Sequence, residues 1–179
     1  MLDTDRIKEA EKNVSSYLKE GLLKKTEPNK NVMDILLRNA KESLMVAESQ
    51  KDISDLWVIV CSYYAMFYYA NAALLKFGYK VGEKIVHKVT SDALIVYIRG
   101  KLKKSLIEEY EETQKEALSL AGVKADELIE AFDFERGKRS FIQYTTKETE
   151  KHSKSKTSLQ RAKDFAKEME KLLFSSSTP

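Results

Sequence analysis

Residues that break helices are rare and widely spaced in this chain. Proline occurs only at positions 28 and 179, and the six glycines stand at positions 21, 78, 82, 100, 122 and 137. Long stretches without such breakers are typical of helices, and no stretch shows the sustained apolar and polar alternation of a half-buried strand. The sequence therefore predicts an all-α fold: an up-and-down helical bundle of four to five main helices plus short extra helices.

Apolar residues repeat at intervals of three and four between these breakers, and this periodicity places the helices. The expected helices are a first one with its apolar face at residues 7–18, which stops near Gly21, then residues 31–50, 55–77, 89–99 and 102–121, a segment that starts at 123, and residues 159–173. Residues 78–87, which hold two glycines, are expected to form a loop. The polar, aperiodic residues 145–158 are also expected to form a loop, a flexible one.

The length of 179 residues suits one hydrophobic core. We therefore predict a single domain over residues 1–179, with residues 1–27 as an N-terminal helical extension and residues 175–179 as a flexible tail. There are 31 Lys and Arg residues against 28 Asp and Glu, and a net charge of +3 is too weak to indicate a nucleic-acid partner by itself.

The cysteine content and the N-terminus favour a cytoplasmic location. The single cysteine excludes an internal disulfide, and the charged start of the chain resembles no secretory signal. Residues 57–75 are apolar and nearly long enough to cross a bilayer. Several tyrosines and Asn71 would then lie at mid-depth, so we predict a central helix of the bundle and no membrane partner.

None of the common catalytic signatures occurs in the sequence. It has no phosphate-binding glycine loop, no zinc-binding HExxH and no GxSxG nucleophile motif. No metal site and no cofactor are predicted. Of the two histidines, His152 lies in a run of charged residues and is expected to be solvated. His87 stands at a junction of loop and helix between two lysines, where it could bind the loop or help to hold a phosphate.

The most suggestive cluster of charge lies in the segment FDFERGKRSFIQY at residues 132–144. If one helix continues through Gly137, Arg136 and Arg139 lie on the same face, where two guanidinium groups could grip a phosphate, with Lys138 nearby. The neighbouring aromatic residues could stack on a base. The alternative is that both arginines pair with acidic side chains of this segment or of another helix.

A second distinctive run is SYYAMFYYAN at residues 62–71. Aromatic residues all around a helix, with small residues between them, are typical of core packing, and buried tyrosine hydroxyls then need polar partners.

Together, these residues resemble HEPN-domain proteins, in particular the small stand-alone prokaryotic branch. The resemblance covers about residues 34–174. It is carried by the YYAMF helix, the loop that leads to His87 and Lys88, the R-x-x-R-x-x-x-x-Y segment that ends at Tyr144, and the amphipathic last helix.

This resemblance implies a helical homodimer that pairs with a small nucleotidyltransferase in a toxin–antitoxin system. It also implies contact with RNA or a nucleotide, and many members cleave RNA without metal. The predicted RNA- or nucleotide-binding residues are Arg136, Lys138, Arg139, His87 and Tyr64. The candidate catalytic residues are Arg139, Tyr144 and His87.

The chain departs from the family's nuclease motif, an arginine followed by histidine after four to six residues. The corresponding positions, 141–146, hold Phe, Ile, Gln, Tyr and Thr. Neither glutamine nor tyrosine replaces imidazole as a base at neutral pH. We therefore predict a nucleotide- or RNA-binding protein with a degenerate nuclease motif. The alternatives are an active metal-independent endoribonuclease toxin and a non-catalytic protein-interaction bundle.

Overall fold

The structure is a computed structural model that describes residues 2–103, 105–120 and 148–175. This described part of the chain is mostly helical (80%), with six helices packed together and a small two-stranded sheet. The all-α prediction is confirmed at this level. In chain order the elements are α1 (Thr4–Glu20), β1 (Leu23–Lys25), α2 (Lys30–Ser49), α3 (Asp55–Lys76), β2 (Tyr79–Val81), α4 (Val86–Ala93), a π-helical turn (Leu94–Ile98), a 3-10 turn (Arg99–Lys101), α5 (Ser105–Leu120) and α7 (Glu148–Phe174).

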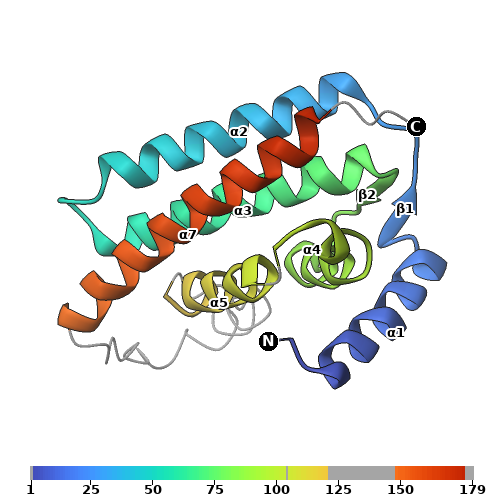
Figure 1. Ribbon diagram of the computed structural model, residues 1–179, viewed down its shortest axis with the longest axis horizontal. Helices are drawn as coiled ribbons and strands as arrows, with labels where there is room; N and C mark the ends of the chain where they lie inside the picture. The colour runs from blue at the N-terminus through green and yellow to red at the C-terminus, as the bar shows by residue number, and fades with distance from the viewer. Residues whose placement is uncertain (1, 104, 121–147, 176–179) are drawn as a thin grey trace, which may run out of the picture.

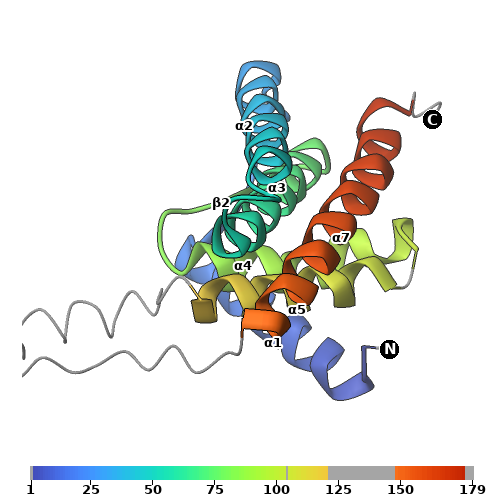
Figure 2. The same ribbon diagram turned by 90° about the vertical axis from the view of Figure 1, so that its left-hand side faces the viewer.

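The helices form two sets that cross each other. Helices α2, α3 and α7 lie side by side in the plane of Figure 1, whereas α4 is seen end-on beneath them. Figure 2, turned by a right angle, shows α4 and α5 lengthwise across the lower part of the molecule, with α1 below them. The helices of the second set therefore lie across those of the first, which a purely up-and-down arrangement does not describe.

Helix α3 is the centre of the core and packs against α2, α5 and α7. Ser54 caps its start by accepting a hydrogen bond from the amide of Trp57, and Gly78, with φ of 85°, follows its end. The helix is long and apolar enough to cross a membrane by length and composition, as the core helix of a folded domain also is. In this structure 72% of its apolar window is buried against the other helices.

Helix α7 begins well before residue 159, so the predicted loop is wrong for residues 148–158; residues 145–147 lie outside the described part of the chain. Two serines explain the error. Ser155 and Ser158 are buried, and their hydroxyls donate to Asp55 of α3 and Glu116 of α5. At the other end, the Nζ atom of Lys76 donates to the last carbonyls of α7. Helix α7 is thus held to α3 at both ends.

The two strands were not predicted. β1 and β2 pair in antiparallel register, with Leu23 opposite Val81, Lys24 opposite Lys80 and Lys25 opposite Tyr79. β1 lies within the segment predicted as a helical extension, and β2 within the predicted loop. Each strand is only three residues long, too short to show a period of two in the sequence.

Candidate functional site

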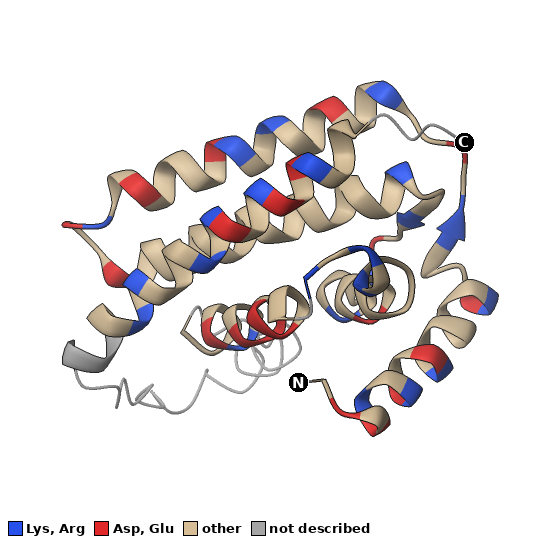
Figure 3. Ribbon diagram, in the orientation of Figure 1, with Lys and Arg blue, Asp and Glu red and all other residues tan. Residues whose placement is uncertain are grey.

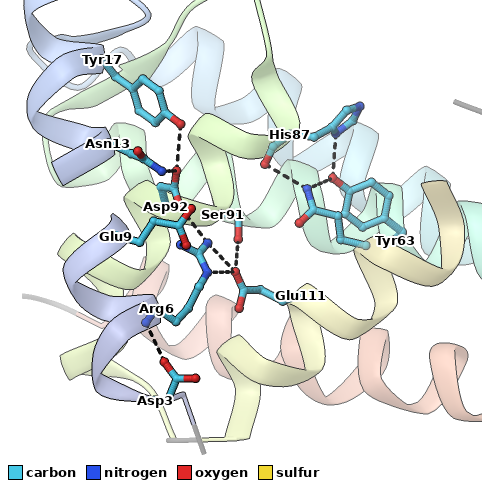
Figure 4. A network of polar contacts seen from close by, with 11 residues as sticks. Asp3, Arg6, Glu9, Asn13, Tyr17, Tyr63, His87, Ser91, Asp92 and Glu111 are labelled. Atoms are coloured by element: carbon cyan, nitrogen blue, oxygen red, sulfur yellow. Dashed lines mark hydrogen bonds and ion pairs between the residues drawn. The ribbon is translucent and has the colours of Figure 1, made fainter. Parts of the chain in front are cut away.

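His87 lies in the first turn of α4. The residue just before this helix has a rare backbone conformation. Ile85 precedes the helix with φ of 43° and provides no side-chain cap. The Nδ1 atom of His87 lies 2.7 Å from the hydroxyl of Tyr63, which is fully buried on α3. The imidazole is therefore anchored to the core of the protein although it stands at the edge of a loop (Figure 4).

Gln114 of α5 also contacts this pair and favours one assignment of the proton between the Tyr63 hydroxyl and Nδ1 of His87. Its Nε2 atom donates to the Tyr63 hydroxyl at 3.2 Å and to the His87 carbonyl at 3.0 Å. Because the Tyr63 oxygen accepts from Gln114, its own proton is available for Nδ1 of His87, and in this tautomer the neutral ring carries its proton on Nε2; in the other tautomer Nδ1 donates to Tyr63 and Nε2 is an acceptor. That Nε2 has no partner among the described residues and points away from Tyr63 in Figure 4. The site therefore presents one ring nitrogen held in a fixed position, which is a hydrogen-bond donor when Tyr63 donates to Nδ1.

Aromatic rings surround this histidine. The ring centres of Phe67, Tyr63 and Tyr64 lie 4.9, 5.5 and 6.0 Å from the centre of the imidazole. Tyr63 is buried, whereas Phe67, Tyr64 and Tyr68 are partly exposed. The structure thus brings together two of the predicted binding residues, His87 and Tyr64. Partly exposed rings beside a donor are suited to stacking on a base.

Burial lowers the pKa of His87 below its ordinary value of 6.5. At pH values between 6.5 and the lower pKa of His87 in the folded protein, His87 is protonated in the unfolded chain but neutral in the folded protein. We therefore expect the free energy of unfolding to fall as the pH drops from about 6.5 towards 5.5. His87→Gln should remove this part of the pH dependence.

The measurement is the urea midpoint of the wild-type protein and of His87→Gln at pH 7.5, 6.5 and 5.5. The difference between the two proteins isolates His87 from every other titrating group. If the two midpoints change in parallel over this range, the imidazole does not titrate as its burial requires.

A second polar cluster lies beside His87 and was not predicted. Asp92, also on α4, is completely buried. Its Oδ2 accepts hydrogen bonds from Tyr17 and Asn13, and its Oδ1 lies 2.7 Å from Nη2 of Arg6. The same guanidinium donates to Oε1 of Glu111 at 2.7 Å (Figure 4).

This cluster joins α1 to α4 and α5 and acts as a structural tie. Partial burial by itself lowers the pKa of Arg6, but its bonds to Glu111 and Asp92 outweigh this and raise it, so the ion pairs persist at neutral pH. A signal was present in the sequence: Asp92 is the one charged residue in the run VTSDALIVYI, and a buried charge needs a partner. The sequence does not indicate that the partner is Arg6.

The other histidine, His152, contacts a carboxylate. Nδ1 of His152 lies 3.1 Å from Asp55 at the start of α3, although 51% of the His152 side chain is exposed. Burial alone raises the pKa of Asp55, but hydrogen bonds from Ser155 and His152 outweigh it and lower that pKa. His152 is therefore exposed as predicted but helps to fasten α7, which the prediction of a purely solvated residue missed.

Four of the predicted site residues, Arg136, Lys138, Arg139 and Tyr144, lie outside the described residues. Their relation to His87 and Tyr64 stays a prediction. Within the described ranges no group of three or more His, Cys, Asp or Glu side chains is placed to hold a metal ion.

Comparisons of the chain with protein-family models, with curated proteins and with solved structures find no match.

Proposed function

We propose that this chain is a HEPN-type helical protein that binds RNA or a nucleotide and has a degenerate nuclease motif. The proposal includes the homodimer, the cytoplasmic location and the pairing with a nucleotidyltransferase in a toxin–antitoxin-like system. The homodimer and the pairing depend on the sequence resemblance. The cytoplasmic location depends on the cysteine content and the charged N-terminus. The binding function has support from the geometry around His87.

The observation that carries the proposal is the fixed imidazole among partly exposed aromatic rings. Nε2 of His87 is a donor without a protein partner in the described residues, and a phosphate oxygen is a strong acceptor for such a donor. Exposed Lys84 and Lys88 flank His87 in the sequence and add positive charge. Tyr64 supplies a ring face for stacking.

The test uses purified protein, structured RNA and single-stranded RNA without added metal, with cleavage and retention read on the same gels. We expect salt-sensitive retention without cleavage. His87→Ala should weaken retention by between about twofold and tenfold, as expected for one lost hydrogen bond. Tyr64→Ala should weaken it by about fivefold or more, because stacking contributes about 1–3 kcal/mol per base.

The matched control is His152→Ala, which removes the other histidine, far along the chain from His87, and should leave retention unchanged. The variant Arg136→Ala/Arg139→Ala tests the predicted arginine pair in the same assay and should also weaken retention. A wild-type protein that retains no RNA at low salt contradicts the proposal.

One observation favours the active endoribonuclease as a second candidate. Burial keeps His87 neutral at pH 7, and a neutral imidazole can act as a base when Nδ1 rather than Nε2 carries the proton. Tyr63 can accept that proton in a hydrogen bond. The discriminating result is metal-independent cleavage, with toxicity on expression, that disappears in both His87→Ala and Arg139→Ala.

A further inference from the structure

A group of basic side chains surrounds the small sheet, on a different part of the surface from His87. Lys24 and Lys25 of β1 and Lys80 of β2 are exposed, and Arg99 and Lys101 lie on the 3-10 turn that follows the π-helical turn. Figure 3 shows β1 and β2 in blue beside this turn. We call these five residues the sheet patch.

The charges of the sheet patch are not balanced within the protein. Lys24 and Lys80 are direct cross-strand partners, and two like charges placed opposite each other repel. None of the five makes an ion pair with a described residue. A ligand with several negative charges would relieve this repulsion.

Aromatic rings lie among these cations. Tyr79 of β2 stacks on Tyr97 with ring centres 3.8 Å apart and planes 16° from parallel. The Nζ atom of Lys101 lies 4.8 Å from the centre of the Phe77 ring. These contacts link the sheet to the turn that carries Arg99 and Lys101, so that the cations belong to one continuous surface.

An open depression of about 400 Å³ lies within this surface. Its lining includes Lys25, Thr26, Phe77 and Tyr79, together with Gly78 and one acidic residue, Glu27. The depression therefore brings together the cation of Lys25, the hydroxyl of Thr26 and two aromatic residues, Phe77 and Tyr79. Burial raises the pKa of the adjoining Tyr97 to about 12, so its hydroxyl remains neutral beside a bound anion.

We propose that the sheet patch binds the phosphate backbone of a single-stranded nucleic acid. Spaced lysines that follow a backbone, with aromatic rings between them, are the usual composition of such surfaces. The class of ligand rests on the proposed function, but the surface is separate from His87 and Tyr64. Its role is to add affinity without reading sequence, because phosphate contacts position a nucleic acid and carry no base information.

Lysines on short strands also have a simpler use, which is to prevent the exposed edges from pairing with another chain. That explanation accounts for Lys24 and Lys80. It does not account for Arg99 and Lys101, which lie outside the strands. The two explanations predict different results for the same variant, so one experiment separates them.

The experiment measures fluorescence anisotropy of a labelled oligouridine with the full chain at several salt concentrations. Lys24→Gln/Lys80→Gln should weaken binding at low salt by between about tenfold and a hundredfold. It should also make the slope of log K against log salt shallower by about 1.4, because each contact to a single strand contributes about 0.7. The matched control, Lys8→Gln/Lys12→Gln, removes two exposed lysines of α1 and should change neither.

His87→Ala separates this inference from the proposed function. Weaker binding with an unchanged salt slope in His87→Ala, together with a shallower slope in the lysine pair, supports both. If His87→Ala weakens binding and the lysine pair does not, the sheet patch is excluded and the proposed function stands. If only the lysine pair weakens binding, the sheet patch stands and His87 is excluded as the site.

Three further outcomes overturn the inference. A wild-type protein that ignores oligouridine overturns both proposals. Binding to phosphatidylserine vesicles instead of oligouridine, lost in the lysine pair, assigns the patch to a membrane surface. Normal binding by the lysine pair, with larger species on size-exclusion chromatography, assigns the lysines to edge protection.

Discussion

Arg6→Ala is expected to lower the free energy of unfolding by about 3 kcal/mol, because it leaves a buried carboxylate without its cation. Asp92 is completely buried and Glu111 is largely buried beside it. Arg6 is itself partly exposed, so water can enter its place and partly solvate the carboxylates. The expected loss of unfolding free energy therefore lies at the lower end of the range for broken buried pairs. Tyr17 and Asn13 remain as neutral donors to Asp92.

Urea unfolding at pH 7 measures this loss. The control is Lys41→Ala, which breaks a 3.8 Å pair with Glu170 in which both side chains are well exposed. It should change stability by less than about 0.5 kcal/mol. Arg6→Lys should fall between the two, because an ammonium keeps the charge but cannot reproduce the fork that reaches both carboxylates. Equal losses for Arg6→Ala and Lys41→Ala would contradict the structural role of the tie.

Phe165→Ala is the second change with a large expected effect, a loss of about 3–5 kcal/mol. Phe165 of α7 has no exposed surface, and its ring centre lies 5.6 Å from that of Tyr110 on α5. Truncation leaves a cavity where α7 meets α3 and α5.

Phe174, nine residues further along the same helix, provides the control. Its side chain is 62% exposed, so Phe174→Ala should stay within about 0.5 kcal/mol of the wild type. Thermal unfolding followed by circular dichroism compares the two variants. A similar melting temperature for both would mean that α7 does not pack as described.

The helices that could be predicted from the sequence are those with clear ends and a strong apolar period. Helix α3 is an example: Ser54 and Gly78 mark its ends, and its apolar run could only be buried or span a membrane. Gly100 likewise separates two helical segments, as expected. For α2 the predicted range of 31–50 lies within one residue of the helix, which begins after its cap, Asn29.

The errors have a common physical cause, which is that long-range contacts override local composition. The start of α7 looks like a loop because it is polar and has no apolar period, and serine and threonine are weaker helix formers, but buried Ser155 and Ser158 have acceptors on α3 and α5. The strands form because α2 and α3, which lie between them in the chain, bring residues 79–81 back beside residues 23–25. No local pattern contains that information.

The candidate site could be predicted only in part. His87 stood out because it lies beside lysines at a junction of loop and helix, and Tyr64 because of its aromatic run. The restraint by Tyr63 and Gln114 could not be predicted, because these residues come from two other helices. The tie between Arg6 and Asp92 could not be predicted for the same reason.

The tie also has a consequence for synthesis on the ribosome. Arg6 and Glu111 are 105 residues apart, and at 5–20 residues per second a nascent chain needs between about five and twenty seconds to make the interval. The apolar side of α1, formed by Ala10, Val14 and Tyr17, packs against α4 and the π-helical turn, and it lacks this covering surface until residues 86–98 have been made. The first helix to leave the ribosome therefore waits for α4 before it docks and for α5 before its tie is complete, and during that interval its apolar side is open to a chaperone.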